Sequence, residues 1–211
     1  MEEMHTKKLK TGTTTVGVVC RNAVVLGADK KATMGYLVAS KNTQKIIQIE
    51  DHIGMTIAGA VGDAQALQRY IQAELRLYMF NEGRKIPVTA AANLVSNILY
   101  SRRFYPYMVQ LLIGGHDEKG PHVFSFDPTG SIQEEDEYFS TGSGSVMALG
   151  VLEDKYKKDM DADEAKKLVI RAIRAARERD IATGGRTIDV IIIDSKGYHK
   201  VPEEEIEKIA K

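Results

Sequence analysis

Cysteine is almost missing from this chain of 211 residues, which contains only Cys20. A single cysteine excludes an intrachain disulfide framework and suits a reducing compartment. Neither sign of charge is in excess, because 29 Lys and Arg balance 29 Asp and Glu. Such a balance gives no general attraction to polyanions, so neither nucleic acid nor an anionic membrane surface is expected as a partner.

Long apolar runs are missing as well. No stretch approaches the roughly 20 apolar residues that cross a bilayer. The first ten residues are polar and charged, without the apolar core of a secretory signal. We therefore expect no association with membranes and a cytoplasmic location.

Several common catalytic motifs are absent. The five histidines show no metal-ligand spacing, and the chain has neither a Gly-x-Ser-x-Gly elbow nor a Gly-Lys-Ser/Thr phosphate loop. Cys20 lies in a β-rich run, and this strand implies no helix N-terminus or basic neighbour that would activate its thiol, so it is predicted to fill the core. No metal site is predicted.

The apolar residues, 43% of the chain, are arranged in blocks of strand and helix patterns. The expected strands are 14–20, 23–29, 36–40, 45–50, 54–58, 109–113, 122–127 and 188–193, with a tight turn at Arg21-Asn22. Helices are expected at 63–82, at 87–102, after 145, at 161–180 behind a capping box, and after Pro202. Blocks of strands separated by pairs of helices favour antiparallel sheets with helices packed outside them, in one domain.

The expected helix 63–82 carries an apolar stripe and ends at Gly83. The stripe comprises Leu67, Tyr70, Ile71, Leu75, Tyr78 and Met79. Such a stripe normally faces the core, although a recognition surface is the alternative. The acidic run 134–137 is interpreted as a solvated loop.

The most informative stretch surrounds Gly12 and Thr13. Residues 1–11 carry charge without periodicity and are predicted to be a disordered leader. Order is expected to begin near Thr13, at the head of the first strand. Threonines are common in strands through β-propensity alone. A leader followed by glycine and then threonine is, however, also what self-cleavage between residues 12 and 13 requires, because glycine leaves its carbonyl unhindered.

Six segments together resemble proteasome β-subunits of the archaeal type, and the resemblance spans nearly all of the chain after the leader. These are Gly-Thr-Thr-Thr-Val-Gly at 12–17, Gly-Ala-Asp-Lys-Lys-Ala-Thr at 27–33, Lys45, Thr-Ile-Ala-Gly-Ala-Val-Gly-Asp-Ala-Gln at 56–65, Ser-Thr-Gly-Ser-Gly-Ser at 140–145 and Arg-Asp-Ile-Ala-Thr-Gly-Gly at 179–185. Several motifs in one order are far more specific than any single one.

The resemblance implies an N-terminal nucleophile hydrolase: an α+β fold in which two antiparallel sheets lie between helical layers as a four-layer αββα sandwich. Residues 1–12 would be a propeptide removed by autolysis, and 13–211 a single catalytic domain. It also implies seven-membered β-rings stacked between two rings of α-subunits, fed with unfolded polypeptide by a regulatory ATPase. No cofactor would be required.

The resemblance also assigns the chemistry. Thr13 would be the nucleophile of a threonine endopeptidase, and its freed α-amine the base, because a hydroxyl needs a neighbouring base to attack. Lys45 matches the family lysine beside the nucleophile, and Asp29 its carboxylate partner. The alternative for that pair is an ordinary surface ion pair.

Gly59 matches the residue whose N–H faces the developing oxyanion, although glycines also simply end strands. Ser143, Asp180 and Thr183 match the group that positions the α-amine and a nucleophilic water. Thr183 stands where relatives often carry serine, and it retains a hydroxyl. Lys31 is assigned no role.

For substrate, Thr33 matches a residue that binds extended peptide backbone. The walls of the pocket for the side chain before the cut match Ala32, Ile47, Ile57 and Val61. All four are apolar, so cleavage after hydrophobic residues is predicted.

Three other interpretations remain: an inactive ring subunit, a subunit of the simpler bacterial two-ring particle, and a small-molecule amidase of the same superfamily. The retained Gly12, Thr13, Asp29 and Lys45 argue against the first. The leader argues against the second, whose threonine usually follows the initiator methionine. The segment 140–145 argues against the third.

Overall fold

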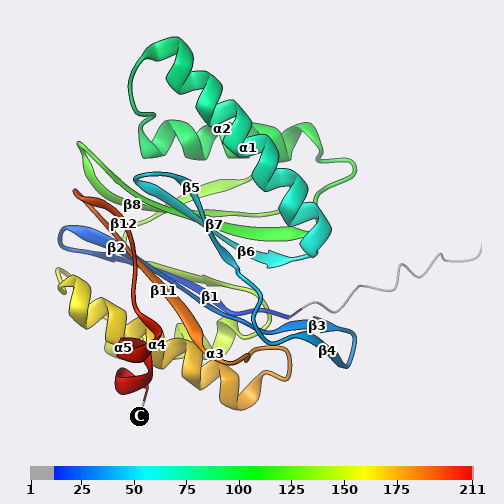
Figure 1. Ribbon diagram of the computed structural model, residues 1–211, viewed down its shortest axis with the longest axis vertical. Helices are drawn as coiled ribbons and strands as arrows, with labels where there is room; N and C mark the ends of the chain where they lie inside the picture. The colour runs from blue at the N-terminus through cyan, green and yellow to red at the C-terminus, as the bar shows by residue number, and fades with distance from the viewer. Residues whose placement is uncertain (1–11, 211) are drawn as a thin grey trace, which may run out of the picture.

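Two five-stranded antiparallel sheets lie face to face, with helices on the outer side of each (Figure 1). The structure is a computed structural model that describes residues 12–210. The predicted α+β fold, a four-layer αββα sandwich, is confirmed. The expected leader, 1–11, lies outside the described residues.

The first sheet has the strand order β10-β1-β2-β11-β12. Its strands are β1 (Thr15–Cys20), β2 (Ala23–Asp29), β10 (Tyr138–Thr141), β11 (Ile188–Asp194) and β12 (Gly197–Lys200). The Arg21-Asn22 turn joins β1 to β2 as predicted, with Cys20 opposite Ala23. All seven residues of β2 are buried, because this central strand is covered on both faces.

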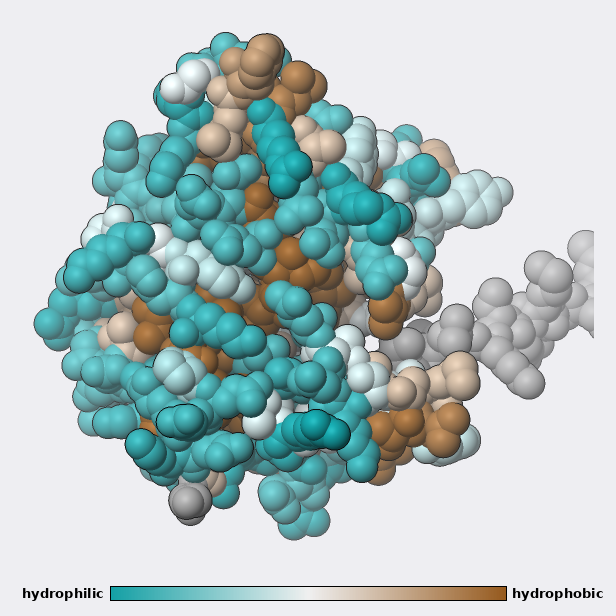
Figure 2. Space-filling model, viewed as in Figure 1, coloured by the Kyte–Doolittle hydropathy of each residue, from teal (hydrophilic) through white to brown (hydrophobic). Residues whose placement is uncertain are grey.

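The second sheet has the order β5-β6-β7-β8-β9. Its strands are β5 (Ile46–Glu50), β6 (Ile53–Gly59), β7 (Val109–Asp117), β8 (Gly120–Phe126) and β9 (Ile132–Glu135). In the chain between β2 and β5, the strands β3 (Ala32–Met34) and β4 (Leu37–Ser40) form a separate two-stranded hairpin. The hairpin carries the exposed apolar side chains of Met34, Leu37 and Val38. Figure 2 shows a brown patch at the lower right, where this hairpin lies in Figure 1.

Helices α1 (Val61–Glu82) and α2 (Val88–Ser101) cover the second sheet. Helices α3 (Ser145–Lys155) and α4 (Ala162–Arg179) cover the first, beside the short α5 (Glu203–Ile209). The predicted capping box is present: the Asp161 side chain accepts from the Glu164 N–H, and the Glu164 side chain from the Asp161 N–H. None of these helices has the length and apolar character needed to cross a bilayer in the part of the chain from 12 to 210.

The core has three clusters, one between each pair of adjacent layers. One lies between α1, α2 and the second sheet, and one between the first sheet and α3 and α4. The third lies between the sheets and includes Leu26, Ile46 and Val123. Cys20 is buried in the cluster under α3 and α4, as predicted, and burial raises its pKa to about 12.

The predicted stripe on α1 is partly wrong. Leu67, Ile71 and Leu75 are fully buried, whereas Tyr70 is 49% exposed and Met79 38% exposed. A helix resting on one sheet buries the row of residues spaced by four, and side chains beside that row reach solvent. The stripe therefore faces the core only along its centre.

The prediction that the acidic run 134–137 is a loop is also partly wrong, because Glu134 and Glu135 belong to β9. They pair with Phe124 and Val123 of β8, and their side chains bind His122 and Ser125. The short strands β3, β9, β10 and β12 were not predicted. Strands of three or four residues give too little alternation to be recognised.

Candidate active site

Thr13 lies two residues before β1, at the end of the first sheet where β2 ends. The register places Thr15 opposite both Ala28 and Thr141, which brings Thr13 close to Asp29 and to the turn at Gly142. Thr13 is buried, and its hydroxyl donates to the Gly12 carbonyl oxygen at 2.7 Å. The hydroxyl therefore lies beside the peptide bond at which cleavage was predicted.

Asp29, the last residue of β2, is fully buried and accepts four hydrogen bonds. Oδ1 accepts from Lys45 Nζ at 2.6 Å and from the Thr14 N–H at 3.0 Å. Oδ2 accepts from the N–H groups of Lys31 and Gly184 at 3.0 and 2.9 Å. The alternative of a surface ion pair is thus excluded, because both partners are buried.

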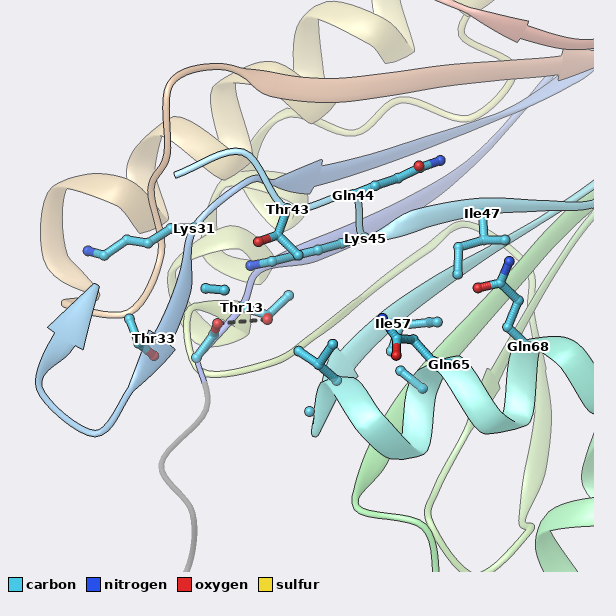
Figure 3. A pocket seen from close by; sticks show the side chains of 15 residues that line it. Thr13, Lys31, Thr33, Thr43, Gln44, Lys45, Ile47, Ile57, Gln65 and Gln68 are labelled. Carbon is cyan, nitrogen blue, oxygen red and sulfur yellow. Dashed lines mark hydrogen bonds between the residues drawn. The ribbon is translucent and has the colours of Figure 1, made fainter. Parts of the chain in front are cut away.

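Lys45 lies immediately before β5 and points toward Thr13 (Figure 3). Burial of the ammonium lowers the pKa of Lys45 from its ordinary value of 10.5, and the charge and hydrogen bond of Asp29 oppose that effect. The lysine is therefore paired with its carboxylate while its proton is held less tightly than in water.

A chain of hydroxyl and carboxylate groups contacts Thr13 from the other side. The Thr13 N–H, an amide in the intact chain, donates to Ser143 Oγ at 3.3 Å. Asp180 Oδ2 accepts from both Ser143 Oγ and Thr183 Oγ1 at 2.5 Å. Asp180 is the C-cap of α4, Ser143 precedes α3, and Thr183 follows α4, so the fold brings all three predicted residues together.

Gly59 ends β6 with a φ of 133°, a backbone conformation that favours glycine. A Cβ added there would lie 2.1 Å from the Met108 carbonyl oxygen. Both the conformation and the lack of space therefore require glycine at this strand end.

A pocket of about 330 Å³ opens beside Thr13, with Lys45 and Gly59 in its lining (Figure 3). The predicted substrate-binding residues Ala32, Thr33, Ile47, Ile57 and Val61 all line it. Within residues 12–210, the buried Thr33 hydroxyl oxygen has no hydrogen-bond partner. The fold thus collects these residues from β3, β5, β6 and α1 into one cavity.

Comparison with known proteins decides the family. A family model described as "Proteasome subunit" matches residues 9–193. A "Proteasome subunit beta" of Methanoregula boonei is 50% identical over 208 residues, covering 99% of this chain and 97% of the relative. Its counterpart from Ferroglobus placidus is 52% identical over 206 residues, covering 98% and 97%. That from Methanothermobacter thermautotrophicus is 46% identical over 205 residues, covering 97% of each.

This chain belongs to the proteasome β-subunit family. Its predicted archaeal-type resemblance is confirmed by near full-length relatives. Proteasome β-subunits are threonine proteases of protein degradation that need no cofactor, and they assemble with α-subunits in a core particle. Within residues 12–210, no group of three or more His, Cys, Asp or Glu side chains is placed to hold a metal ion.

Some residues of this β-subunit site were not predicted from the sequence. Gln65 and Gln68 line the pocket with Val61. Their spacing of three and four residues along α1 could have indicated a shared face. Lys31, which was assigned no role, also lines the pocket, and its ammonium donates to the Ile181 carbonyl at 2.5 Å. The fully buried Thr14, whose hydroxyl lies 2.6 Å from that of Thr183, gave no signal in the sequence.

Proposed function

We propose that this β-subunit is made as a precursor, that residues 1–12 are removed by self-cleavage, and that 13–211 is the mature catalytic domain. One observation carries the proposal. The Thr13 hydroxyl lies 2.7 Å from the carbonyl oxygen of the peptide bond to be cut. The nitrogen to be freed already contacts Ser143 of the Asp180 cluster.

Self-cleavage needs no external reagent except water. Thr13 Oγ1 forms a bond to the Gly12 carbonyl carbon, the bond from that carbon to the Thr13 nitrogen breaks, and the hydroxyl proton ends on the nitrogen. Water then hydrolyses the resulting ester, which releases the leader with Gly12 as a carboxylate and restores the hydroxyl. A nucleophile held next to its target makes such a step efficient, because the entropy of encounter is already lost.

In the mature subunit the freed amine takes the hydroxyl proton when Thr13 attacks a substrate peptide bond. Its reference pKa of about 7.7 to 8.0 is close to neutral, where proton transfer is most effective. The Lys45 ammonium, oriented by Asp29, favours the deprotonated hydroxyl and keeps the amine from holding its proton too tightly. The same attack produces an acyl-enzyme that water hydrolyses.

Two further groups complete the site. The Gly59 N–H is the donor to the oxyanion, a contact worth about 2.7 to 4 kcal/mol in comparable hydrolases. Ser143, Asp180 and Thr183 hold the amine and the hydrolytic water through their shared hydrogen bonds. Thr183 contributes its hydroxyl to this group by donating to Asp180 Oδ2.

Substrates are unfolded polypeptides bound in extended form beside β3, where the Thr33 hydroxyl, which has no partner among residues 12–210, accepts a backbone N–H. The apolar side chains of Ala32, Ile47, Ile57 and Val61 favour cleavage after hydrophobic residues. Seven β-subunits form a ring, two such rings stack between two α-rings, and a cytoplasmic ATPase unfoldase feeds the closed chamber.

Intact-mass spectrometry after mixing with the α-subunit tests the proposal. The unmodified chain is expected to lose residues 1–12, whereas Thr13→Ala keeps its full mass and hydrolyses no peptide. Thr13→Ser, which keeps a hydroxyl, is expected to be processed. Thr129→Ala, an exposed position outside the site, serves as the matched control.

The inactive-subunit alternative predicts a different result. An unmodified chain that keeps its full mass in assembled particles, together with no hydrolysis of unfolded protein, would contradict the proposal.

A further inference from the structure

Gly12 lies in a space with no room for a side chain. A Cβ added to it would lie 1.6 Å from the Cβ of Ala182, 2.9 Å from the Ala182 Cα and 3.0 Å from Ser143 Oγ. Carbon atoms that are not bonded prefer a separation of about 3.5 to 4.0 Å. The methyl group of Ala182 therefore occupies the place that a side chain at residue 12 would need.

Ala182 cannot easily move aside, because its loop is tied at several points. The Ala182 N–H donates to Asp180 Oδ1 at 3.3 Å, and the Gly184 N–H donates to Asp29 Oδ2 at 2.9 Å. The Gly184 carbonyl accepts from the Lys30 N–H at 2.9 Å. The loop that carries Ala182 is thus held by the same two carboxylates that organise the site.

The position of Gly12 matters only while the leader is attached. In the precursor, Gly12 is buried and its carbonyl oxygen accepts the Thr13 hydroxyl. Attack requires this carbonyl to stay beside Thr13 Oγ1, and a displacement of about 1 Å can cost roughly a hundredfold in rate. The contacts that fix the position of Gly12 therefore control the rate of self-cleavage.

We propose that Ala182 is a positioning residue for self-cleavage. Its methyl group packs on Gly12 and keeps the Gly12 carbonyl in place for attack by Thr13. It supplies no proton and forms no bond, so the chemical step is unchanged. This inference rests on the proposed self-cleavage and gives the reason why residue 12 must be glycine.

A pair of complementary substitutions tests it. Processing is followed over time by intact mass after the full chain is mixed with the α-subunit. Gly12→Ala is expected to slow leader loss about a hundredfold, because the backbone must shift away from Thr13. Adding Ala182→Gly removes the atom at 1.6 Å. The double variant is therefore expected to lose its leader at least about tenfold faster than Gly12→Ala does. Contacts with the Ala182 Cα and Ser143 keep the recovery incomplete.

The opposite change enlarges residue 182. In the chain with Gly12, Ala182→Val is expected to slow leader loss about tenfold or more, because overpacking displaces Gly12. If Ala182→Val does not assemble, Ala182→Ser answers the same question, with slower leader loss expected. Ala73→Gly, at an exposed position of α1, is the control and is expected to give no recovery with Gly12→Ala.

The outcomes separate this inference from the proposal on which it rests. If the unmodified chain is processed but the double variant remains as slow as Gly12→Ala, Ala182 does not position Gly12 and the inference is overturned. The inference is also overturned if Ala182→Val, or Ala182→Ser in its place, assembles and loses the leader at the unmodified rate. If the unmodified chain keeps its leader, self-cleavage itself fails.

Discussion

Asp29 is the most connected side chain of the site. Its four hydrogen bonds come from residues before β1, after β2, before β5 and before β11, so one carboxylate aligns four chain segments. The sequence predicted its pairing with Lys45. It did not predict that Asp29 also holds the backbone next to Thr13.

Asp29→Asn tests this role. The amide keeps the shape of the carboxylate but leaves the Lys45 ammonium buried without its counterion, so the free energy of unfolding is expected to fall by about 3 to 5 kcal/mol. Peptide hydrolysis is expected to fall by about a hundredfold or more as the site loses its alignment. Denaturant unfolding and hydrolysis rates measure the two effects. Asp154→Asn, at a fully exposed position on α3, should change neither.

The pKa of Lys45 predicts a pH dependence. Burial shifts it below 10.5, so the ammonium loses its proton at a lower pH than an exposed lysine does. If the charge is needed for catalysis, kcat/KM falls with rising pH through this lowered pKa, before 10.5 is reached. Lys45→Arg keeps a charge across that range. Its pH profile, whatever its height, should lack this decline, and an identical decline in both proteins would remove Lys45 as its cause.

At the scale of elements, the end of a strand or helix places each functional group. Asp29 ends β2, Gly59 ends β6, Val61 begins α1 and Asp180 caps α4. Long elements with regular periodicity were predicted within a few residues. Of the strands of three or four residues, β4 was predicted but β3, β9, β10 and β12 were not, because their pairing partners rather than their own patterns determine them.

The capping box of α4 is a local feature with a measurable effect. Asp161→Ala removes the acceptor for the Glu164 N–H, so the free energy of unfolding is expected to fall by about 1 kcal/mol. Glu178→Ala, in the exposed last turn of the same helix, is the control and should not destabilise, because an acidic group there opposes the helix dipole. Denaturant midpoints of the two variants give the comparison.

The whole molecule is needed to form the pocket, whose lining comes from the β3–β4 hairpin, the second sheet and α1. Periodicity cannot show which side chains from separate elements face one cavity. The resemblance to the family named the five substrate-binding residues among them, and the fold brings those five together with Thr13, Lys45 and Gly59. It also adds Gln65 and Gln68, which make one side of the pocket polar.

Substrate preference is a property of this assembled pocket. Peptides with a hydrophobic residue before the cut are expected to be hydrolysed at least about tenfold faster than acidic ones, because burying an apolar side chain is favourable by about 1.5 to 3 kcal/mol. Equal turnover would contradict the apolar assignment. Val61→Glu adds a carboxylate at a helix N-terminus, where it is tolerated, and should raise turnover of basic peptides. Val146→Glu, in the first turn of α3, is the matched control.

The sequence by itself determined the blocks of strands and helices, because periodicity is local. Its motifs, which are read in linear order, determined the resemblance that implied the family, the αββα layers and the roles of Thr13, Asp29 and Lys45. Only the tertiary structure decided that Asp29 binds four segments, that Thr14 joins the Asp180 cluster, and that Ala182 fills the space beside Gly12. Those contacts join residues up to 170 positions apart. Their geometry comes from packing two sheets and their helices, which no single segment encodes.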